Sequence, residues 1–103
     1  MSLVVVGLSH HTSPVELRER LHFPESSLPN ALMHVRSLLG DAGVVVLSTC
    51  NRVEIYASTE ASPGEAHDAI RRFMGEWHKL AEPEFRESLY EYEGREAIGH
   101  LFR

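Results

Sequence analysis

Apolar positions along the chain fall into strand-like and helix-like runs. Residues 3–8 form a nearly continuous apolar, β-branched run, which suits a strand buried on both faces or a central strand, and residues 44–47 predict a second buried strand. Apolar and polar residues alternate over 53–58, which predicts a third strand with one more polar face, and residues 89–92 indicate a fourth. Helical spacing predicts one helix over 28–39 and another that carries its apolar stripe as far as Trp77.

Capping residues set the expected boundaries of the helices. Residues 13–16 and 62–65 each place a serine, a proline and a glutamate at the spacing of a capping box. The first of these helices is short and ends near Leu21, whereas Gly40 is placed to stop the helix over 28–39. Gly94 precedes a last helix, whose buried side is expected to carry Ala97, Ile98, Leu101 and Phe102.

The order βαββαβ, with extra helices, predicts an α+β fold of the ferredoxin-like type. This is a sandwich in which a four-stranded, mainly antiparallel sheet has helices on one face. An open α/β sheet is the alternative. With 103 residues, 43% of them hydrophobic, residues 1–103 are expected to form one domain. The helical pattern is still running at residues 99–103, so we expect a domain truncated within its last helix.

Composition narrows the functional classes. A formal net charge of -5 gives no support to binding of a phosphate backbone by the surface as a whole. The sequence holds no apolar run long enough to span a membrane and no recognisable signal peptide. Cys50 is the only cysteine, so no internal disulfide forms, and a cytoplasmic location is expected.

Cys50 lies between two predicted strands and two residues before Arg52. A thiol at a strand end beside a guanidinium favours the nucleophilic thiolate. The alternative is a small buried hydrophobe at the end of a strand, beside an Asn51 that only shapes the turn. Arg52 fits either a ligand for a carboxylate or a salt bridge to Glu54. Taken alone, His100 fits a partly buried helix histidine with one hydrogen-bonded nitrogen. The residues by themselves leave these alternatives open.

Two motifs resemble the amino-terminal signatures of glutamyl-tRNA reductases. They are residues 7–19 (GLSHHTSPVELRE) and residues 47–56 (LSTCNRVEIY), and residues 99–103 (GHLFR) resemble the start of a third. The resemblance runs along the whole chain in order. It implies that residues 1–103 are the N-terminal catalytic, substrate-binding domain, and that the NADPH-binding and dimerisation domains of the family lie outside this chain.

The resemblance implies a two-step reaction. Cys50 attacks the ester of glutamyl-tRNA and leaves a glutamyl thioester, which NADPH reduces to glutamate-1-semialdehyde, the first step of tetrapyrrole (5-aminolevulinate, haem) biosynthesis. Cys50 and His100 are then catalytic, and the substrate-binding residues are Thr49, Cys50, Asn51 and Arg52. The implied partners are glutamyl-tRNA, the aminotransferase that takes the aldehyde, and a second copy in a homodimer. The isolated chain is expected to be inactive as a reductase.

Other functions remain open at this point. A ferredoxin-like binding or regulatory module would have no chemistry at Cys50, and a cysteine acyltransferase or hydrolase would form the thioester without reducing it. His10, His11 and Cys50 are possible metal ligands. Adjacent histidines point apart on an extended backbone, however, and no fourth ligand is evident, so no metal is expected. Ser9, Thr12 and Ser13 are expected to cap the following helix and are candidates for the pocket wall.

Overall fold

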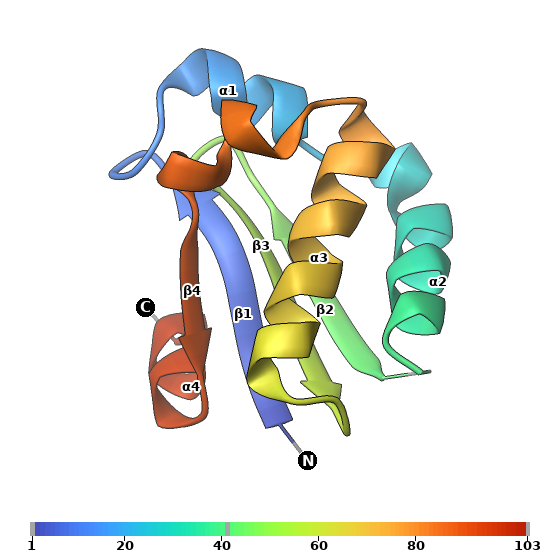
Figure 1. The fold of residues 1–103 in the computed structure, drawn as a ribbon. Helices are drawn as coiled ribbons and strands as arrows, with labels where there is room; N and C mark the ends of the chain where they lie inside the picture. The colour runs from blue at the N-terminus through green and yellow to red at the C-terminus, as the bar shows by residue number, and fades with distance from the viewer. Residues whose placement is uncertain (1, 41, 103) are drawn as a thin grey trace.

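The computed structural model describes residues 2–40 and 42–102. Its strands are β1 (Ser2–Ser9), β2 (Gly43–Ser48), β3 (Arg52–Thr59) and β4 (Tyr90–Glu93) (Figure 1). Its α-helices are α1 (Val15–Leu21), α2 (Leu28–Leu38), α3 (Pro63–His78) and α4 (Arg95–Leu101). Short 3₁₀ turns are η1 (Glu25–Ser27), η2 (Glu82–Glu84) and η3 (Arg86–Ser88).

The four strands form one sheet in the order β2-β3-β1-β4. Every neighbouring pair is antiparallel, with β1 and β3 in the centre and β2 and β4 at the edges. With the helices in their sequence positions, this order is that of the ferredoxin-like βαββαβ sandwich, so the predicted fold is confirmed, except that α4 lies on the opposite face from the other helices. The open α/β alternative is wrong, because such a sheet requires parallel neighbours.

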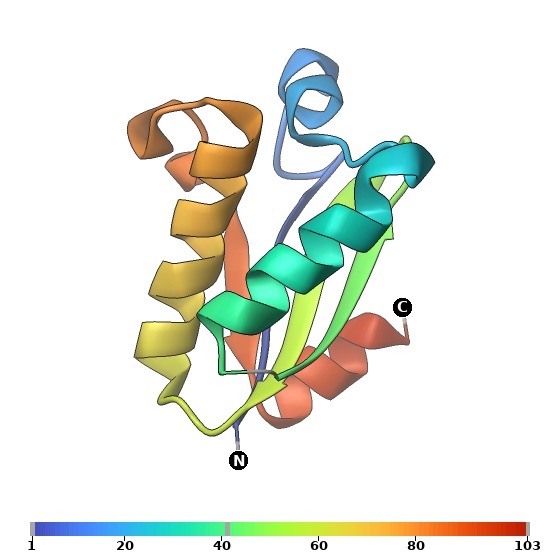
Figure 2. The same cartoon turned by 90° about the vertical axis from the view of Figure 1, so that its right-hand side faces the viewer.

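The main core lies between the sheet and the helices α2 and α3, which cover the same face of the sheet (Figure 2). Alternate residues of the two central strands, such as Val6 and Ile55, point into this core and meet Phe73 of α3. The opposite face carries α4, where Ala97 packs with Val5 and Tyr56 in a second, smaller cluster. The central strands are therefore covered on both faces, which matches the apolar run of β1.

Burial of β2 and β3 is the reverse of the prediction. β2 was expected to be buried, but it is an edge strand and its Val45 is 48% exposed. β3 was expected to have a polar face, but Glu54 on that face is 0% exposed and Tyr56 is 3% exposed. The reason is position, because β3 pairs on both edges and faces α4 on its second side. Apolar content alone does not decide which strand is central.

The ends of the helices follow the sequence in part. Ser62 accepts a hydrogen bond from the backbone N–H of Glu65 at 3.3 Å, so its role as N-cap is confirmed, whereas the Glu65 carboxylate accepts from the Ser62 hydroxyl at 2.9 Å and not from its backbone N–H as in a capping box. The first capping box is wrong, because the Ser13 hydroxyl instead donates to the carbonyl of Ser9 at 2.8 Å and no side chain caps α1. In α4, Ala97 is buried as predicted. Ile98 and Phe102, predicted to be buried with it, are exposed.

A buried arginine fixes β4 against α3. The guanidinium of Arg71 pairs with Asp68 one turn earlier on α3, with Glu82 of η2 at 2.8 Å and with Glu91 of β4. Burial disfavours its charged form, but hydrogen bonds to Glu91 and Glu82 outweigh this and raise the pKa of Arg71. A buried charge with several partners resists separation, so these pairs hold the short edge strand in register.

No helix among residues 2–40 and 42–102 is long and apolar enough to cross a membrane.

His78, at the end of α3, packs its ring edge-on against Phe23, with the ring centroids 4.6 Å apart. Its Nε2 is buried and has no hydrogen-bond partner. Burial, with a smaller contribution from the charge of His22, lowers the pKa of His78 to about 4. The folded protein therefore keeps this ring neutral at pH values where the unfolded chain protonates it.

We expect the free energy of unfolding to fall as the pH is lowered from about 6.5, the ordinary histidine pKa, to about 4, the value in the fold. In this window only the unfolded chain takes up the His78 proton, so acid favours unfolding. A His78→Phe variant has no proton to take up here, so its free energy of unfolding should fall less than that of the parent between these two pH values. The difference should be on the order of 1 kcal/mol, because the half-buried histidine ring keeps part of its hydration. Urea unfolding at several pH values measures this difference, and identical pH dependence in the two proteins would contradict it.

Candidate active site

The loop that joins β2 to β3 is held by its own threonine. The hydroxyl of Thr49 accepts hydrogen bonds from the backbone N–H groups of Asn51 and Arg52, both at 3.2 Å. The backbone N–H of Thr49 also donates to the carbonyl of Arg52 at 2.8 Å. Threonine and serine commonly close turns in this way. The loop therefore presents Cys50 at a defined tip.

Two other segments fix the tip of this loop from outside. Nε of Arg18 in α1 donates to the carbonyl oxygen of Cys50 at 3.3 Å, and the backbone N–H of His10 donates to the carbonyl of Asn51 at 2.8 Å. The thiol of Cys50 is exposed. The interpretation of Cys50 as a buried hydrophobe is therefore wrong. The guanidinium expected beside its thiol was that of Arg52, whose Nη1 instead lies 3.3 Å from Glu54, and Arg18 contacts only the backbone carbonyl of Cys50.

A fully buried carboxylate, that of Glu54, joins four polar side chains on the α4 side of the sheet. Its Oε1 accepts a hydrogen bond from Tyr56 at 3.1 Å and lies 3.3 Å from Nη1 of Arg52. Its Oε2 accepts a hydrogen bond from Tyr90 at 2.5 Å and lies 2.6 Å from Nε2 of His100. Burying a carboxylate is costly without such partners. The four contacts therefore tie the positions of Arg52 and His100 to each other.

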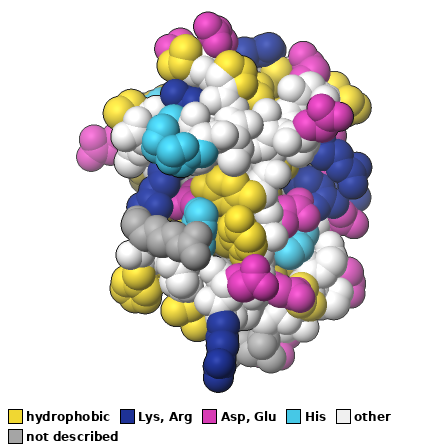
Figure 3. Space-filling view, turned by 90° about the vertical axis from the view of Figure 1, so that its left-hand side faces the viewer, with side chains coloured by type: hydrophobic (Ala, Val, Ile, Leu, Met, Phe, Trp, Pro, Cys, Tyr) yellow, Lys and Arg dark blue, Asp and Glu magenta, His cyan; other side chains and the backbone are white. Residues whose placement is uncertain are grey.

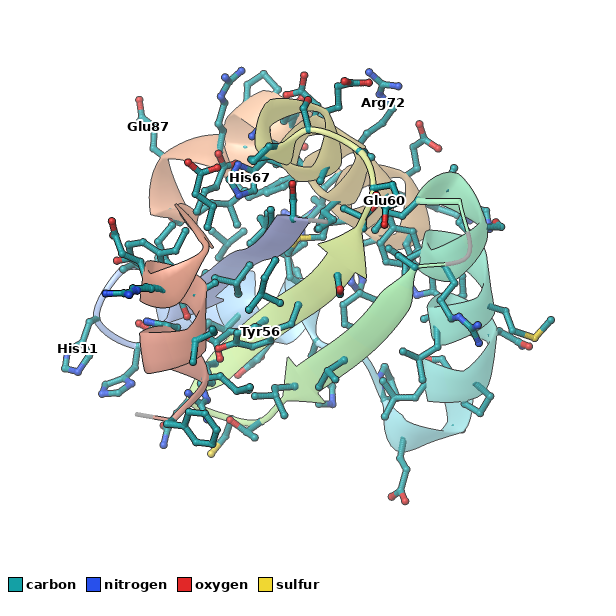
Figure 4. The ribbon with its side chains drawn as sticks, turned by 90° about the horizontal axis from the view of Figure 1, so that it is seen from below. His11, Tyr56, Glu60, His67, Arg72 and Glu87 are labelled. Atoms are coloured by element: carbon teal, nitrogen blue, oxygen red, sulfur yellow. The ribbon has the colours of Figure 1, made fainter. Side chains whose placement is uncertain are left out.

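The two tyrosines remain hydrogen-bond donors to Glu54. Burial first, and then the charge and hydrogen bond of Glu54, raises the pKa of Tyr56 and of Tyr90. Both hydroxyls therefore stay protonated further into the alkaline range than an ordinary tyrosine does. Figure 4 shows Tyr56 on β3 beside α4, whereas His11 lies at the outer edge and points away from the sheet.

Gly7 makes room for this network. In the sheet it lies opposite Glu54 of β3 on one side and opposite Tyr90 of β4 on the other. A Cβ at this position would lie 2.7 Å from Cγ of Glu54 and 2.7 Å from the carbonyl oxygen of Val53. Because Gly7 has no side chain, the Tyr90 side chain can cross β1 at this position and reach Glu54. An isolated glycine within a strand often marks such a close approach.

His100 uses one ring nitrogen and leaves the other without a partner. Its Nε2 faces Glu54, while its Nδ1 is buried and has no hydrogen-bond partner. The ring lies 4.6 Å from the ring of Tyr90 and 5.2 Å from that of Tyr92, measured between centroids. This is the partly buried histidine with one satisfied nitrogen that its place on a helix indicated. On the face that carries β4 and α4, Figure 3 shows histidines beside an apolar patch.

Two hollows share the Cys50 loop and divide the predicted site residues between them. The larger, of about 440 Å³, is lined by Ser9, His10, His11, Asn51, Arg52, Tyr90 and His100. The smaller, of about 110 Å³, is lined by Val15, Arg18, Glu19, His22, Thr49 and Cys50. The structure thus brings Arg52 and His100 to one hollow and places Cys50 in the other. Ser9 lines a hollow as expected, whereas Thr12 and Ser13 line neither of the two.

Glu54 and Tyr90 were not singled out in the sequence. Glu54 was considered only as a surface partner for Arg52, and that salt bridge is present, but at a fully buried carboxylate. Two signals were available: an isolated glycine inside an apolar strand, and tyrosines on strand faces that were expected to be polar.

The two adjacent histidines do not point apart as predicted. The rings of His10 and His11 lie with their centroids 3.9 Å apart, because Ser9 and Thr12 close a turn here in place of an extended backbone. Within the part of the chain that the structure describes, no group of three or more His, Cys, Asp or Glu side chains is arranged to hold a metal ion.

Comparison with known proteins gives a consistent result. Residues 6–103 match the family model described as the glutamyl-tRNAGlu reductase N-terminal domain. The chain is 45% identical over 103 residues to a glutamyl-tRNA reductase of Syntrophotalea carbinolica and 46% identical to one of Trichlorobacter lovleyi. All of this chain is covered in both cases, but only 23% and 24% of those relatives.

A solved structure supports the same comparison. The glutamyl-tRNA reductase from Methanopyrus kandleri matches with a TM-score of 0.67 and 31% identity, over 98% of this chain and 21% of that chain. The chain thus spans about a quarter or less of the length of the proteins that it resembles.

Replacing Gly7 tests the space that the Glu54 network needs. A Gly7→Ala variant should lose about 1–3 kcal/mol of unfolding free energy, the usual cost of overpacking a core, because its methyl group would displace Glu54. Gly99→Ala is the matched control, since a Cβ at Gly99 in α4 meets nothing within 4 Å. Urea denaturation of both variants measures the effect. A Gly7→Ala protein as stable as the control would show that the space is not required.

Proposed function

This chain belongs to the glutamyl-tRNA reductase family, whose N-terminal domain model it matches over residues 6–103, and we propose that it carries the substrate-binding and nucleophilic part of such an enzyme. The substrate is glutamyl-tRNA and the product is glutamate-1-semialdehyde for tetrapyrrole biosynthesis. The observation that carries the proposal is the exposed Cys50 thiol on a braced loop, two residues from an arginine that a buried carboxylate anchors.

Cys50 attacks the carbonyl carbon of the aminoacyl ester. A carbon–sulfur bond forms, the bond from that carbon to the ribose oxygen breaks, and tRNA leaves with its hydroxyl restored by a proton. A thiolate suits this step because it is nucleophilic near neutral pH. The hydrogen bonds that Thr49, Arg18 and His10 make around the loop keep the sulfur in one place during the attack.

Arg52 holds the side-chain carboxylate of the glutamyl group. Its side chain is 30% exposed and lines the larger hollow, while Nη1 is directed to Glu54. The guanidinium keeps further N–H donors for a second carboxylate, and a planar fork suits bidentate binding. Asn51 lines the same hollow and offers an amide to the substrate. Thr49, whose hydroxyl closes the turn, contributes mainly by shaping the loop.

His100 acts on the larger hollow rather than directly beside Cys50. Its Nε2 holds Glu54 and thereby helps to orient Arg52, while its Nδ1 is buried and has no hydrogen-bond partner. We therefore assign His100 to the orientation of Arg52 and, through Arg52, of the glutamyl group.

The described residues do not fit the NADPH that the reaction requires. Dinucleotide sites of the common type use a glycine-rich turn after a parallel strand, and every strand pair here is antiparallel. NADPH, when bound, supplies the hydride that reduces the acyl group. We assign its binding, and the contacts of a homodimer, to parts of the longer protein, and the aldehyde to an aminotransferase. A lone exposed thiol suits the cytoplasm, where thiols stay reduced.

The assignment of Cys50 is tested in the full-length protein. Cys50→Ser should abolish both release of tRNA and NADPH oxidation with glutamyl-tRNA, because a serine hydroxyl is a weaker nucleophile and an oxygen ester accepts hydride less readily. The two readouts are a filter assay for deacylated tRNA and the absorbance of NADPH. Circular dichroism of the variant checks the fold. Activity equal to that of the parent would exclude Cys50 as the nucleophile.

A further inference from the structure

The smaller hollow beside Cys50 is built largely by helix α1, which crosses the end of the sheet at which β2 and β3 join (Figure 1). Val15, Arg18 and Glu19 come from α1, and His22 follows it directly. Its volume is about 110 Å³. Sites for whole ligands usually measure roughly 300–1,000 Å³. This hollow therefore suits a single ring of a larger substrate.

His22 presents a hydrogen-bond donor to this hollow. The hydroxyl oxygen of Ser48 accepts the backbone N–H of Phe23 at 2.9 Å and lies 2.8 Å from Nδ1 of His22. With the Ser48 hydroxyl donating to Nδ1, each polar hydrogen in this group has an acceptor, and Nε2 is left as the donor nitrogen of the ring. That nitrogen has no partner among residues 2–40 and 42–102, so its N–H is free for a ligand.

Glu19 presents an acceptor to the same hollow. Its carboxylate is exposed and has no ion pair or hydrogen bond with any other residue that the structure describes. The two flanking arginines are already engaged: Arg18 donates to backbone oxygens, and Arg20 lies 3.9 Å from Glu84. One free donor and one free acceptor therefore face a space of ring size next to the thiol.

We propose that this hollow binds the terminal ribose of the tRNA, and that the free hydroxyl next to the ester donates to Glu19 and accepts from His22. A hydroxyl is both a donor and an acceptor, so it matches this pair, whereas a phosphate would be repelled by Glu19. Val15, 47% exposed at the rim, provides an apolar surface for the C–H face of the sugar. The inference rests on the proposed function and deepens it.

The position of the hollow follows the geometry of the ester. The acyl and alkoxy arms leave the carbonyl carbon in different directions. Arg52 takes the glutamyl arm at the larger hollow, so the ribose arm extends toward the hollow that Thr49 and Cys50 line. The loop thus separates the group that stays on the sulfur from the group that leaves.

The test uses the full-length protein and two substrates. One is glutamyl-tRNA, and the other is the same tRNA, acylated chemically, whose terminal sugar lacks the hydroxyl next to the ester. Glu19→Ala should lower kcat/KM for tRNA release about tenfold with the first substrate, mostly through KM, as expected for a lost hydrogen bond to a charged acceptor. With the second substrate it should cause no further loss, because the partner hydroxyl is already absent.

Glu16→Ala is the matched control, since Glu16 is exposed on the same helix, one turn earlier, and does not line the hollow. It should leave both substrates unaffected. An equal loss from Glu19→Ala with both substrates, or no loss with either, would overturn the ribose assignment. If the parent protein releases no tRNA above the level of Cys50→Ser, the proposed function fails instead, so the two failures are distinguishable.

Discussion

The carboxyl group of Glu54 is fully buried in a central strand, and the rest of the site depends on the hydrogen-bond partners that this group requires. Two tyrosine hydroxyls, an arginine and a histidine converge on its two oxygens. A carboxylate in this position is tolerated only with such a set of partners. The constraint joins two strands and one helix, because Tyr90 lies on β4 and His100 on α4 while the other partners lie on β3.

Much of the surrounding fold serves that convergence. Gly7 leaves the space across β1 through which Tyr90 reaches Glu54. The edge strand β4 is only four residues long, and the ion pairs of Arg71 with Glu82 and Glu91 hold it against α3. Packing of Ala97 on Val5 then places α4 over the second face of the sheet. Core packing on one face and a polar network on the other therefore use the same two central strands.

The loop that carries Cys50 lies at the end of these strands and divides the proposed chemistry. On one side is the larger hollow with Arg52 and His100, and on the other the smaller hollow with Glu19 and His22. The loop itself is rigid for a local reason, since Thr49 closes it. A nucleophile held between two subsites suits an acyl transfer in which one arm of the substrate is kept and the other is released.

The sequence by itself determined the strands and helices, their order and thus the ferredoxin-like fold, because these depend on periodicity and local caps such as that at Ser62. Its two signatures also identified the family, but whether Cys50 is exposed was left open until the structure placed it. Only the tertiary structure decided that β2 is an edge strand, that Glu54 is buried and that His100 lies away from Cys50. The physical reason is that burial in a strand depends on which strands flank it and what packs on each face. The partner that Glu54 finds in Tyr90 is 36 residues away, beyond the reach of any local pattern.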